Sequence, residues 1–417
     1  MTHSISLKGD KIIWMTVVMF AMFSVVAVFS SSSFLAASQG TTKIAIFVQQ
    51  IKSVLVGFAA LVICYLIPMR WYRNLAFIYF GICIIMLVML YIPPFQAKIN
   101  GAVRGIKIAS RTIQPFEFAK VGIVLYLARA MEKWEDSLDT YKDFFLKLAL
   151  PIFAACGLIV ANSISSTILV GGISMLMLIF MNIRWKYILS MMGIILAAAG
   201  LMYGIYTVFF KGNPERLEHS AGKVFNRFGT LESRIDHHFN AGQEEEVDKE
   251  SMRQSENARI AISEGGLFGK GPGNSTQRYS LSMAFSDFIF AFIVEEYGLL
   301  GGGLIIALYT IFLFRCIRLS NRCGTSFSSS LVTGISFLIV IQAFIHILVN
   351  VRIMPITGQT LPLVSHGGTA YLAMSGAVGM ILSVNKQLDK QDRMAAMRDN
   401  VKNQQINTNE DKPEDNN

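Results

Sequence analysis

The sequence contains few charged residues for its length. Only 16% of its 417 residues are Asp, Glu, Lys or Arg, whereas about 25% is usual for soluble globular proteins. Hydrophobic residues make up 53% of the chain, and the mean hydropathy is +0.47. The chain therefore has too few polar side chains to cover a water-facing surface of this size. This excludes a soluble, fibrous or disordered protein.

Several sequence signals are also missing. The five cysteines form no CxxC pair and no Cys/His cluster with metal-binding spacing, so we expect free thiols and no zinc. The first apolar run, from Ile12, has no small-residue cleavage site near its end, which indicates a membrane span rather than a signal peptide. The net charge of +9 would suggest nucleic acid in a soluble chain. In a membrane protein, basic cytoplasmic loops explain such a charge, so we expect no nucleic-acid partner.

Long apolar runs dominate what is present. Those that are long enough to span a bilayer as helices lie near residues 12–31, 45–67, 74–92, 117–131, 144–162, 164–183, 186–210, 284–314, 327–351 and 367–385. The alternating pattern of an outer-membrane barrel is absent. The sequence thus predicts an all-α, polytopic inner-membrane protein with about ten transmembrane helices. These helices occupy residues 1–386, and a polar, disordered cytoplasmic tail follows at 387–417.

The basic residues predict the orientation of these spans. With a cytoplasmic N-terminus, every short inner loop is basic, for example at Arg70 and Arg184, so both termini are expected to be cytoplasmic. Residues 211–283 then form a long extracytoplasmic loop. The shorter outer loop at 93–116 is purely basic, which the positive-inside rule disfavours, and an anionic ligand would explain it.

The first of three motifs runs from Asn100 to Lys120. Arg104 and Lys107 carry groups that suit phosphate. Glu117 and Lys120 lie three residues apart on one helix face. They either form an ion pair that allows two charges to sit in a membrane bundle, or mark a functional site, because charges in spans are costly.

The second motif runs from Gly265 to Gly298. Glycine-rich backbone around Lys270 could cradle phosphate, although it is no Walker loop and a plain glycine turn remains the alternative. Asp287 opens a span. Either Ser286 or Asp287 is a helix N-cap, or Asp287 accepts a proton or holds a divalent cation. Glu295 and Glu296 are expected to lie deeper in this span, at membrane depth. Carboxylates there need partners, and Lys120 is a candidate.

The third motif runs from Pro355 to Thr369, immediately before the last span. Its prolines and glycines, Gly367 and Gly368 among them, indicate a broken or re-entrant turn that lines a cavity. His366 is more typical of an interfacial histidine than of a catalyst. In the long loop, His237 and His238 are typical of a solvated pair, although a metal site stays open.

Together these motifs resemble the SEDS family (FtsW/RodA/SpoVE; shape, elongation, division and sporulation). The family pattern NGAxRW…QPSE…K is similar to Asn100, Gly101, Arg104, Gln114, Pro115, Glu117 and Lys120. GGxxGxGxGNSxQ…DFIFAxxxEExG is similar to Gly265 through Gly298, and PxTGxxLPxxSxGG to Pro355 through Gly368. The Gly-Asn-Ser run at 273–275 is most like the cell-division branch, with Gly105 and Phe116 as departures from the pattern.

The resemblance implies an activity and partners. It implies a peptidoglycan glycosyltransferase that polymerises lipid II at the outer face of the bacterial cytoplasmic membrane, at the septum for the division branch. Asp287 would be the catalytic carboxylate, assisted by a divalent cation (Mg²⁺ or Mn²⁺) and no organic cofactor. A class B penicillin-binding transpeptidase and other divisome membrane proteins would be its partners. The expected substrate-binding residues are Arg104, Lys107, Glu117, Lys120, Lys270, Asn274, Ser275, Gln277 and Ser365, with Glu295, Glu296, Gly367 and Gly368 shaping the cavity.

Two other functions fit the same motifs. A lipid II flippase would use the cavity and its charges without bond chemistry. A non-catalytic scaffold would only recruit the transpeptidase through its helices. Transporters are often built from two related halves, and the sequence has no internal repeat, so polymerisation is the favoured interpretation.

Overall fold

The computed structural model describes residues 9–31, 40–99, 102–108, 111–138, 140–209, 229, 232, 249–277 and 286–410. Its long helices are α1 (Lys11–Ser31), α3 (Lys43–Leu66), α4 (Met69–Met89), α5 (Pro115–Trp134), α8 (Ile164–Phe180), α9 (Trp185–Phe209), α12 (Lys249–Gly265), α13 (Ile289–Asn321), α14 (Ser326–Asn350) and α15 (Gly368–Glu410). Between α5 and α8 lie η2 (Glu135–Ser137), α6 (Tyr141–Phe144), the π-helical turn η3 (Phe145–Ala149) and α7 (Leu150–Val160).

Each of the ten predicted spans coincides with a helix, so the polytopic helical class is confirmed. Seven helices of the described chain are long and apolar enough to cross a membrane by composition alone. Of the other three, α8 is short, α5 is made more polar by residues such as Glu117 and Lys120, and the apolar first part of α15 continues into a polar second part.

The prediction of an all-α fold misses a small sheet. Strands β1 (Gln96–Ile99), β2 (Ala102–Ile108) and β3 (Arg111–Ile113) form an antiparallel sheet in the order β1-β2-β3, after the short helix η1 (Pro93–Phe95). Ile106 pairs with Gln96 on one side and with Ile113 on the other. β-Branched residues such as Val103, Ile106 and Ile108 favour a strand, and they stand among the basic residues of the first motif, where the sequence predicts a loop.

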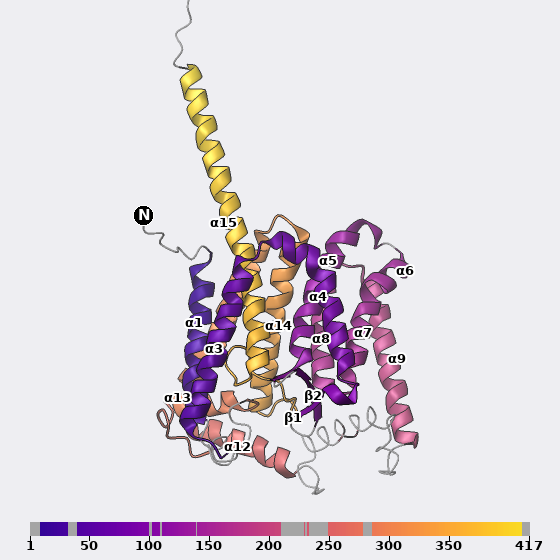
Figure 1. Cartoon of the computed structure of the whole chain (residues 1–417), viewed down its shortest axis with the longest axis vertical. Helices are drawn as coiled ribbons and strands as arrows, with labels where there is room; N and C mark the ends of the chain where they lie inside the picture. The colour runs from indigo at the N-terminus through magenta and orange to yellow at the C-terminus, as the bar shows by residue number, and fades with distance from the viewer. Residues whose placement is uncertain are drawn as a thin grey trace, which may run out of the picture.

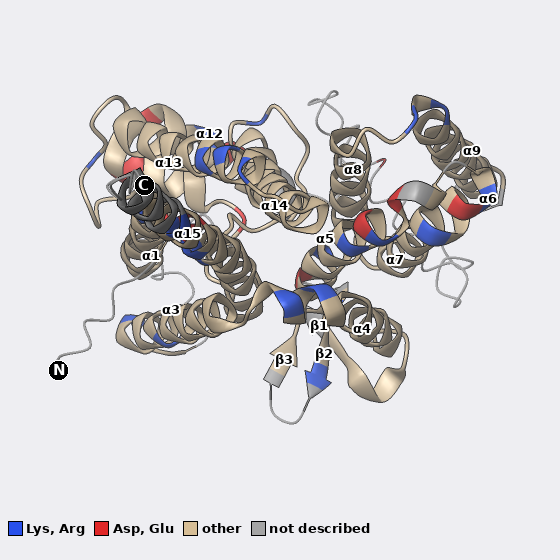
Figure 2. Ribbon diagram, turned by 90° about the horizontal axis from the view of Figure 1, so that it is seen from above, with Lys and Arg blue, Asp and Glu red and all other residues tan. Residues whose placement is uncertain are grey.

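The helices run between two ends of the bundle (Figure 1). We call the end where α1 begins and α15 leaves the bundle the tail end, and the end that carries β1–β3 and α12 the sheet end. Contacts support this layout, because Asp10 before α1 pairs with Arg315 near the end of α13, and Arg322 pairs with Asp392 on α15 at 2.6 Å. In the view along the bundle axis, many of the Lys and Arg residues lie at helix ends and in connections (Figure 2).

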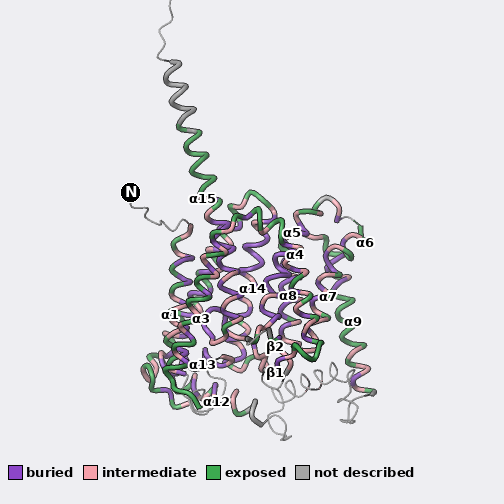
Figure 3. The backbone as a smooth tube through the Cα atoms, viewed as in Figure 1, coloured by how far each residue is buried: buried purple, intermediate pink, exposed green. Residues whose placement is uncertain are grey.

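Burial separates the centre of the bundle from its outer faces (Figure 3). Helix α14 is the most buried span and packs against α5, α8, α13 and α15. The outer helices α3 and α9 expose large apolar side chains, such as Leu55, Leu66, Leu196 and Leu201. An apolar outer surface around a buried central helix is what a protein solvated by lipid requires.

Helix α13 is interrupted at Gly298. This residue has φ 69° and ψ −174°, a conformation open essentially to glycine alone. Residues 299–321 after the break extend about 35 Å at roughly 1.5 Å per residue, enough for one span. Residues 289–297 therefore form a separate half-helix before the span, and Glu295 and Glu296 lie on it rather than deep in the span.

Two further segments differ from their predictions. Part of the 211–283 loop forms α12, which packs against α13 at the sheet end. Residues 387–410, predicted to be disordered, continue α15 as a helix that projects from the tail end (Figure 1). Residues 411–417, and His237 and His238, lie outside the described residues.

Candidate functional site

One face of α14 holds the segment of the third motif in place. Gln342, His346 and Asn350 are spaced by four residues and therefore form a stripe along the helix. The Gln342 amide donates to the Thr360 carbonyl oxygen at 3.0 Å, and His346 Nδ1 lies 2.8 Å from the Gln359 carbonyl oxygen. These buried contacts fix the irregular backbone of residues 355–361 against the bundle.

The same segment and stripe position Asp287. Asn350 Nδ2 donates to the Asp287 carbonyl oxygen at 3.1 Å, and the Ser365 hydroxyl donates to the Ser286 carbonyl oxygen at 2.8 Å. The N-cap residue of α13 is Phe288, and it makes no side-chain capping bond. The alternative that Ser286 or Asp287 acts as the N-cap of this helix is therefore not what the structure has, and capping does not account for the Asp287 carboxylate.

Gly358 brings Asp287 and Arg104 together. It has φ +65°, and a Cβ atom built there would lie 3.5 Å from Arg104 Nη1 and 3.7 Å from Asp287 Oδ2. Arg104 comes from β2 and Asp287 from the turn before α13, and both are half-buried. A guanidinium group and a carboxylate thus both lie close to the position that a Cβ atom of residue 358 would occupy, at the sheet end.

Arg104 keeps hydrogen-bonding capacity at this site. Its Nε atom is buried and has no acceptor among the described residues. Native structures leave few buried donors unpaired, so such a donor needs an explanation, and an anionic ligand supplies one. Lys107 is exposed, and the three atoms nearest the Gly358 Cβ position belong to Arg104 and Asp287. Arg104 is thus the basic residue of the first motif that the structure places at Gly358.

Lys120 is the centre of a buried polar network. Its ammonium group is fully buried and donates to Glu117 Oε1 at 2.8 Å, Gln342 Oε1 at 3.0 Å and Gln359 Oε1 at 3.0 Å. Gln359 in turn donates to the Ser166 hydroxyl at 3.0 Å. Because Gln359 follows Gly358 in the chain, this network supports the backbone that carries the Arg104–Asp287 site.

The glycine-rich motif folds onto the half-helix before Gly298. A Cβ atom at Gly265 or Gly269 would lie 2.2 Å from a backbone oxygen of α13, which only glycine avoids. The backbone amides of Lys270 and Gly271 donate to the carbonyl oxygens of Glu295 and Glu296, each at 2.9 Å. The loop thus packs as an additional layer on the backbone of α13.

Polar groups of this loop surround the Glu295 carboxylate. Glu295 is fully buried and accepts from the Ser275 hydroxyl, from the Thr276 amide at 2.8 Å and from the Gln277 amide at 3.3 Å. Lys270 Nζ lies 2.9 Å from Glu295 Oε1. The backbone donors that the sequence suggested for a phosphate therefore bind a carboxylate of the protein itself.

The prediction that Lys120 pairs with Glu295 or Glu296 is wrong. Lys270 is the cation beside Glu295, and Lys120 is engaged by the first and third motifs. Glu296 instead accepts from the Ser30 hydroxyl and from the Gly273 amide at 2.9 Å. The two acids join α1, α13 and the glycine-rich loop.

Lys270 also interacts with Glu264 at the end of α12. Hydrogen bonds from Lys270 and Thr276 lower the pKa of the exposed Glu264 carboxyl. Partial desolvation opposes the charge of Lys270, but its bonds to Glu264 and Glu295 raise the pKa of its ammonium group overall. The Asn274 side chain donates to the Lys270 carbonyl oxygen at 3.1 Å. These contacts organise the loop and leave its substrate role a prediction.

Gly367 and Gly368 lie at the start of α15, as expected for residues that shape the turn before the last span. The Gly367 carbonyl oxygen accepts from the Tyr371 amide at 2.8 Å. His366 Nδ1 lies 2.6 Å from Gln50 Oε1, and Gln50 donates to the Ser24 hydroxyl at 2.7 Å. His366 therefore links the start of α15 to α3 and α1. This agrees with the prediction that His366 is an interfacial histidine rather than a catalyst.

Several supporting residues were missed from the sequence. Gln342, His346 and Asn350 form a polar stripe in an otherwise apolar span, a signal that was available at i, i+4 and i+8. Ser166 and Gln359 carry no comparable signal. No group of three or more His, Cys, Asp or Glu side chains that could hold a metal occurs in the described part of the chain.

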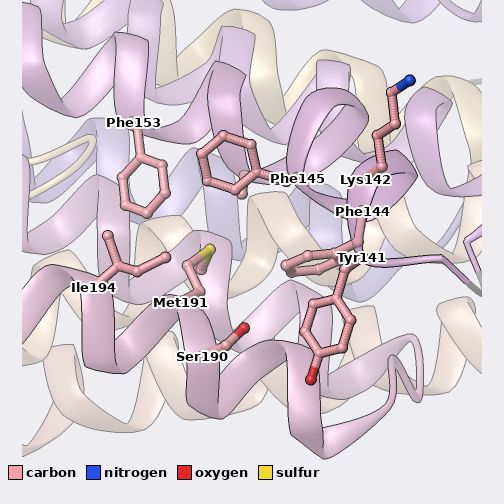
Figure 4. Close-up of a pocket in the computed structure, with 9 residues that line it drawn as sticks. Tyr141, Lys142, Phe144, Phe145, Phe153, Ser190, Met191 and Ile194 are labelled. Carbon is pink, nitrogen blue, oxygen red and sulfur yellow. The ribbon is translucent and has the colours of Figure 1, made fainter.

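An apolar cavity of about 390 Å³ lies apart from this site (Figure 4). It is bounded by aromatic side chains of the α6–α7 region, such as Phe144, Phe145 and Phe153, and by Met191 and Ile194 of α9. No carboxylate lines it. Its charged lining residue is Lys142. The Arg104–Asp287 site, by contrast, brings a guanidinium group and a carboxylate together.

Residues 10–390 match the model of the FtsW/RodA/SpoVE family, described as "Cell cycle protein". The chain belongs to this family. A protein of Geobacter metallireducens named "Probable peptidoglycan glycosyltransferase FtsW" is 27% identical over 91% of this chain and 96% of its own length. A protein of the same name from Bacillus subtilis is 28% identical over 88% of each chain.

Solved structures share the fold of this SEDS chain. A chain from a peptidoglycan synthase complex that coordinates polymerization and crosslinking superposes with a TM-score of 0.68, at 19% identity over 91% of this chain and 98% of that one. Thermus thermophilus RodA superposes with a TM-score of 0.61, at 18% identity over 91% and 97%. The multi-pass arrangement is thus the arrangement of the family.

The gap at Gly358 is expected to be essential to the site. We expect Gly358→Val to abolish activity in a strain that depends on this protein, because the added methyl groups would crowd both Arg104 and Asp287. Gly40→Val is the matched control, since Gly40 has φ +61° and nothing lies within 4 Å of its Cβ position. If both variants were present in the membrane at equal levels and lost activity equally, the effect would come from backbone strain alone.

Proposed function

We propose that this protein is a peptidoglycan glycosyltransferase that polymerises lipid II at the outer face of the bacterial cytoplasmic membrane during cell division. Membership of the family and the names of its relatives support the activity. Asp287 is the catalytic carboxylate of this proposal. The observation that carries it is the placement of the Asp287 carboxylate and the Arg104 guanidinium group next to Gly358 at the sheet end.

The chemistry of lipid II suits these groups. Polymerisation joins a sugar hydroxyl of one molecule to the anomeric carbon of another, and the bond to the pyrophosphate-linked lipid breaks. Asp287 would accept the proton of the attacking hydroxyl. Arg104, with its unpaired Nε, would stabilise the negative charge that develops on the departing pyrophosphate. Lys270 is held in ion pairs with Glu264 and Glu295, and its part in binding the substrate stays a prediction.

A divalent cation fits this proposal as a partner of substrate and protein together. Mg²⁺ is usually bound through one or two carboxylates plus substrate phosphates. Asp287 would be the protein ligand, and the pyrophosphate of lipid II would supply further oxygens. Bound there, the cation would neutralise phosphate charge. Asp287 and Arg104 orient the reacting groups in either case.

One structural relative belongs to a complex that coordinates polymerization and crosslinking. This likeness supports a partnership of our protein with a class B penicillin-binding transpeptidase. Lipid II flipping and a purely structural role remain the two rivals. A flippase would need a cavity that accepts lipid II but no base at Asp287. A scaffold would need neither this cavity nor the base.

The proposal is tested with purified protein, its transpeptidase partner, labelled lipid II and Mg²⁺ or Mn²⁺. We expect a ladder of glycan strands on a gel. Movement of lipid II between leaflets without any ladder would identify a flippase. An intact complex that gives neither a glycan ladder nor movement of lipid II would identify a scaffold.

The orientation of the chain is tested by reporter fusions. The basic inner loops predict that a reporter at residue 240 is active outside the cytoplasm and one after residue 390 inside it. In this proposal the sheet end, with Asp287, faces the outside. The opposite pattern would put the site on the wrong side of the membrane for the substrate sugar and would overturn the proposal.

A further inference from the structure

A second cavity, of about 680 Å³, lies at the tail end, remote from Asp287. The turn from α3 into α4 forms one wall, from Tyr65 to Trp71, and α15 forms the other, from Ser383 to Met394. The lining residues of α15 belong to the part of this helix that leaves the bundle. Beyond the bundle α15 projects from the tail end (Figure 1). Nothing in the proposed glycan chemistry uses this end of the molecule.

The cavity contains positive charge without compensation. Arg70, Lys386 and Lys390 line it, and no Asp or Glu does. None of the three forms an ion pair with a carboxylate of the described residues, whereas Arg73 and Arg322 at the same end are paired, at 2.8 Å and 2.6 Å. Converging cations that the protein leaves unpaired next to its paired ones indicate an anionic ligand.

One of the cations is held in position by packing. Lys386 Nζ lies 4.6 Å from the centre of the Tyr65 ring, a cation–π contact that fixes it without neutralising it. Ser383, one turn earlier on α15, donates to the Ile67 carbonyl oxygen at 2.6 Å and joins the two walls. Gln387 and Gln391 add neutral hydrogen-bonding groups to the lining. The two walls are therefore joined, and Lys386 is held in position between them.

The rim of the cavity is apolar and faces outwards. Leu66 is 59% exposed, Trp71 58% and Met394 50%. The exposed apolar side chains of α3 continue from this rim along the outside of the bundle, with Ile63 59% exposed. A tryptophan beside basic residues at the ends of spans is typical of the membrane interface. The ligand should therefore combine an anionic head with an apolar body.

We propose that this cavity binds the phosphate headgroup of an anionic phospholipid from the leaflet at the tail end. Basic pockets between transmembrane helices are known to hold such headgroups. The headgroup phosphate would lie among Arg70, Lys386 and Lys390, and the acyl chains would follow the apolar face of α3. An acidic protein segment would match the charges but not the apolar rim.

The proposal is tested by native mass spectrometry of the full chain in detergent, titrated with dioleoylphosphatidylglycerol. We expect saturable binding, and no saturable binding of dioleoylphosphatidylcholine. In Lys386→Gln/Lys390→Gln the Kd should rise about 25-fold, because each basic residue near an anionic headgroup contributes roughly fivefold. Both residues lie on the surface of α15, so the variant should remain folded and monodisperse.

The matched control is Arg393→Gln/Arg398→Gln, which removes the same charge from the same helix outside the cavity. It should leave the Kd unchanged. Equal weakening in the two double variants would overturn the proposal, because only bulk surface charge would then matter. Three other results would also overturn the proposal. They are equal binding of phosphatidylcholine and phosphatidylglycerol, full displacement of phosphatidylglycerol by inorganic phosphate, and binding of a glutamate-rich peptide that is tighter than binding of the lipid.

Discussion

Asp287→Asn and Asp287→Ala are both expected to abolish growth in cells that depend on this protein for division. A general base contributes about 10²- to 10⁴-fold to a rate, and the asparagine amide can neither accept the proton nor ligate a hard cation well. Both variants should stay in the membrane and remain bound to the transpeptidase. Complementation, membrane level and co-purification are the three measurements.

The comparison of the two variants separates catalysis from helix capping. Asparagine caps a helix about as well as aspartate, so a capping role would leave Asp287→Asn nearly silent. Glu256→Gln is a control at the same end, because it removes another carboxylate, one that forms ion pairs with Arg259 and Arg352. Growth supported by Asp287→Asn would rule out Asp287 as the base and return the flippase to consideration.

Lys120→Ala is expected to reduce stability more than any other single change at a charged residue described above. It would leave Glu117 buried without its cation, and the side-chain oxygens of Gln342 and Gln359 without a donor. Breaking a buried pair in this way costs about 3–5 kcal/mol. The temperature at which the purified protein loses its monodisperse peak on size-exclusion chromatography measures the effect.

Arg259→Ala is the matched control for Lys120→Ala. Arg259 and Glu256 have the same i,i+3 spacing, but their side chains are 62% and 40% exposed, whereas those of Lys120 and Glu117 are 0% and 10% exposed. An exposed pair contributes about 0.2–1 kcal/mol, so the control should change little. Equal destabilisation would show that burial does not make the Lys120 network important.

The charge-swapped variant Glu117→Lys/Lys120→Glu should recover folding better than activity. The swap restores an ion pair, but a carboxylate in place of the Lys120 ammonium group could not donate to Gln342 and Gln359. Gln359 would then move, and Gly358 with it. Full activity in the swapped variant would show that the pair is only structural.

The spans could be predicted from the sequence because the pattern behind them is local. A run of about 20 apolar residues needs no tertiary information to be recognised as a membrane helix. The β1–β3 sheet could not be predicted in the same way. Its strands are short and carry the basic residues of the first motif, and only pairing across β2 makes them a sheet.

The site was predicted as a set of residues and not as an arrangement. Asp287 and Arg104 could be named from their residue types and places in the motifs. Their meeting at Gly358 depends on three segments far apart in the chain, held by the Gln342–His346–Asn350 stripe of α14. The predicted ion-pair partner of Glu295 was wrong for the same reason. The glycine-rich loop folds onto α13, so that Lys270 rather than Lys120 pairs with Glu295.

The most direct test of the central claim uses proteoliposomes of known orientation. Labelled lipid II is supplied only in the leaflet next to the sheet end, with the transpeptidase partner and Mg²⁺, and the glycan product is followed on a gel over time. Our account predicts strands from the wild type with no prior movement of lipid II, and none from Asp287→Asn. Strands that form only when lipid II is supplied in the other leaflet, or that form equally with Asp287→Asn, would contradict it.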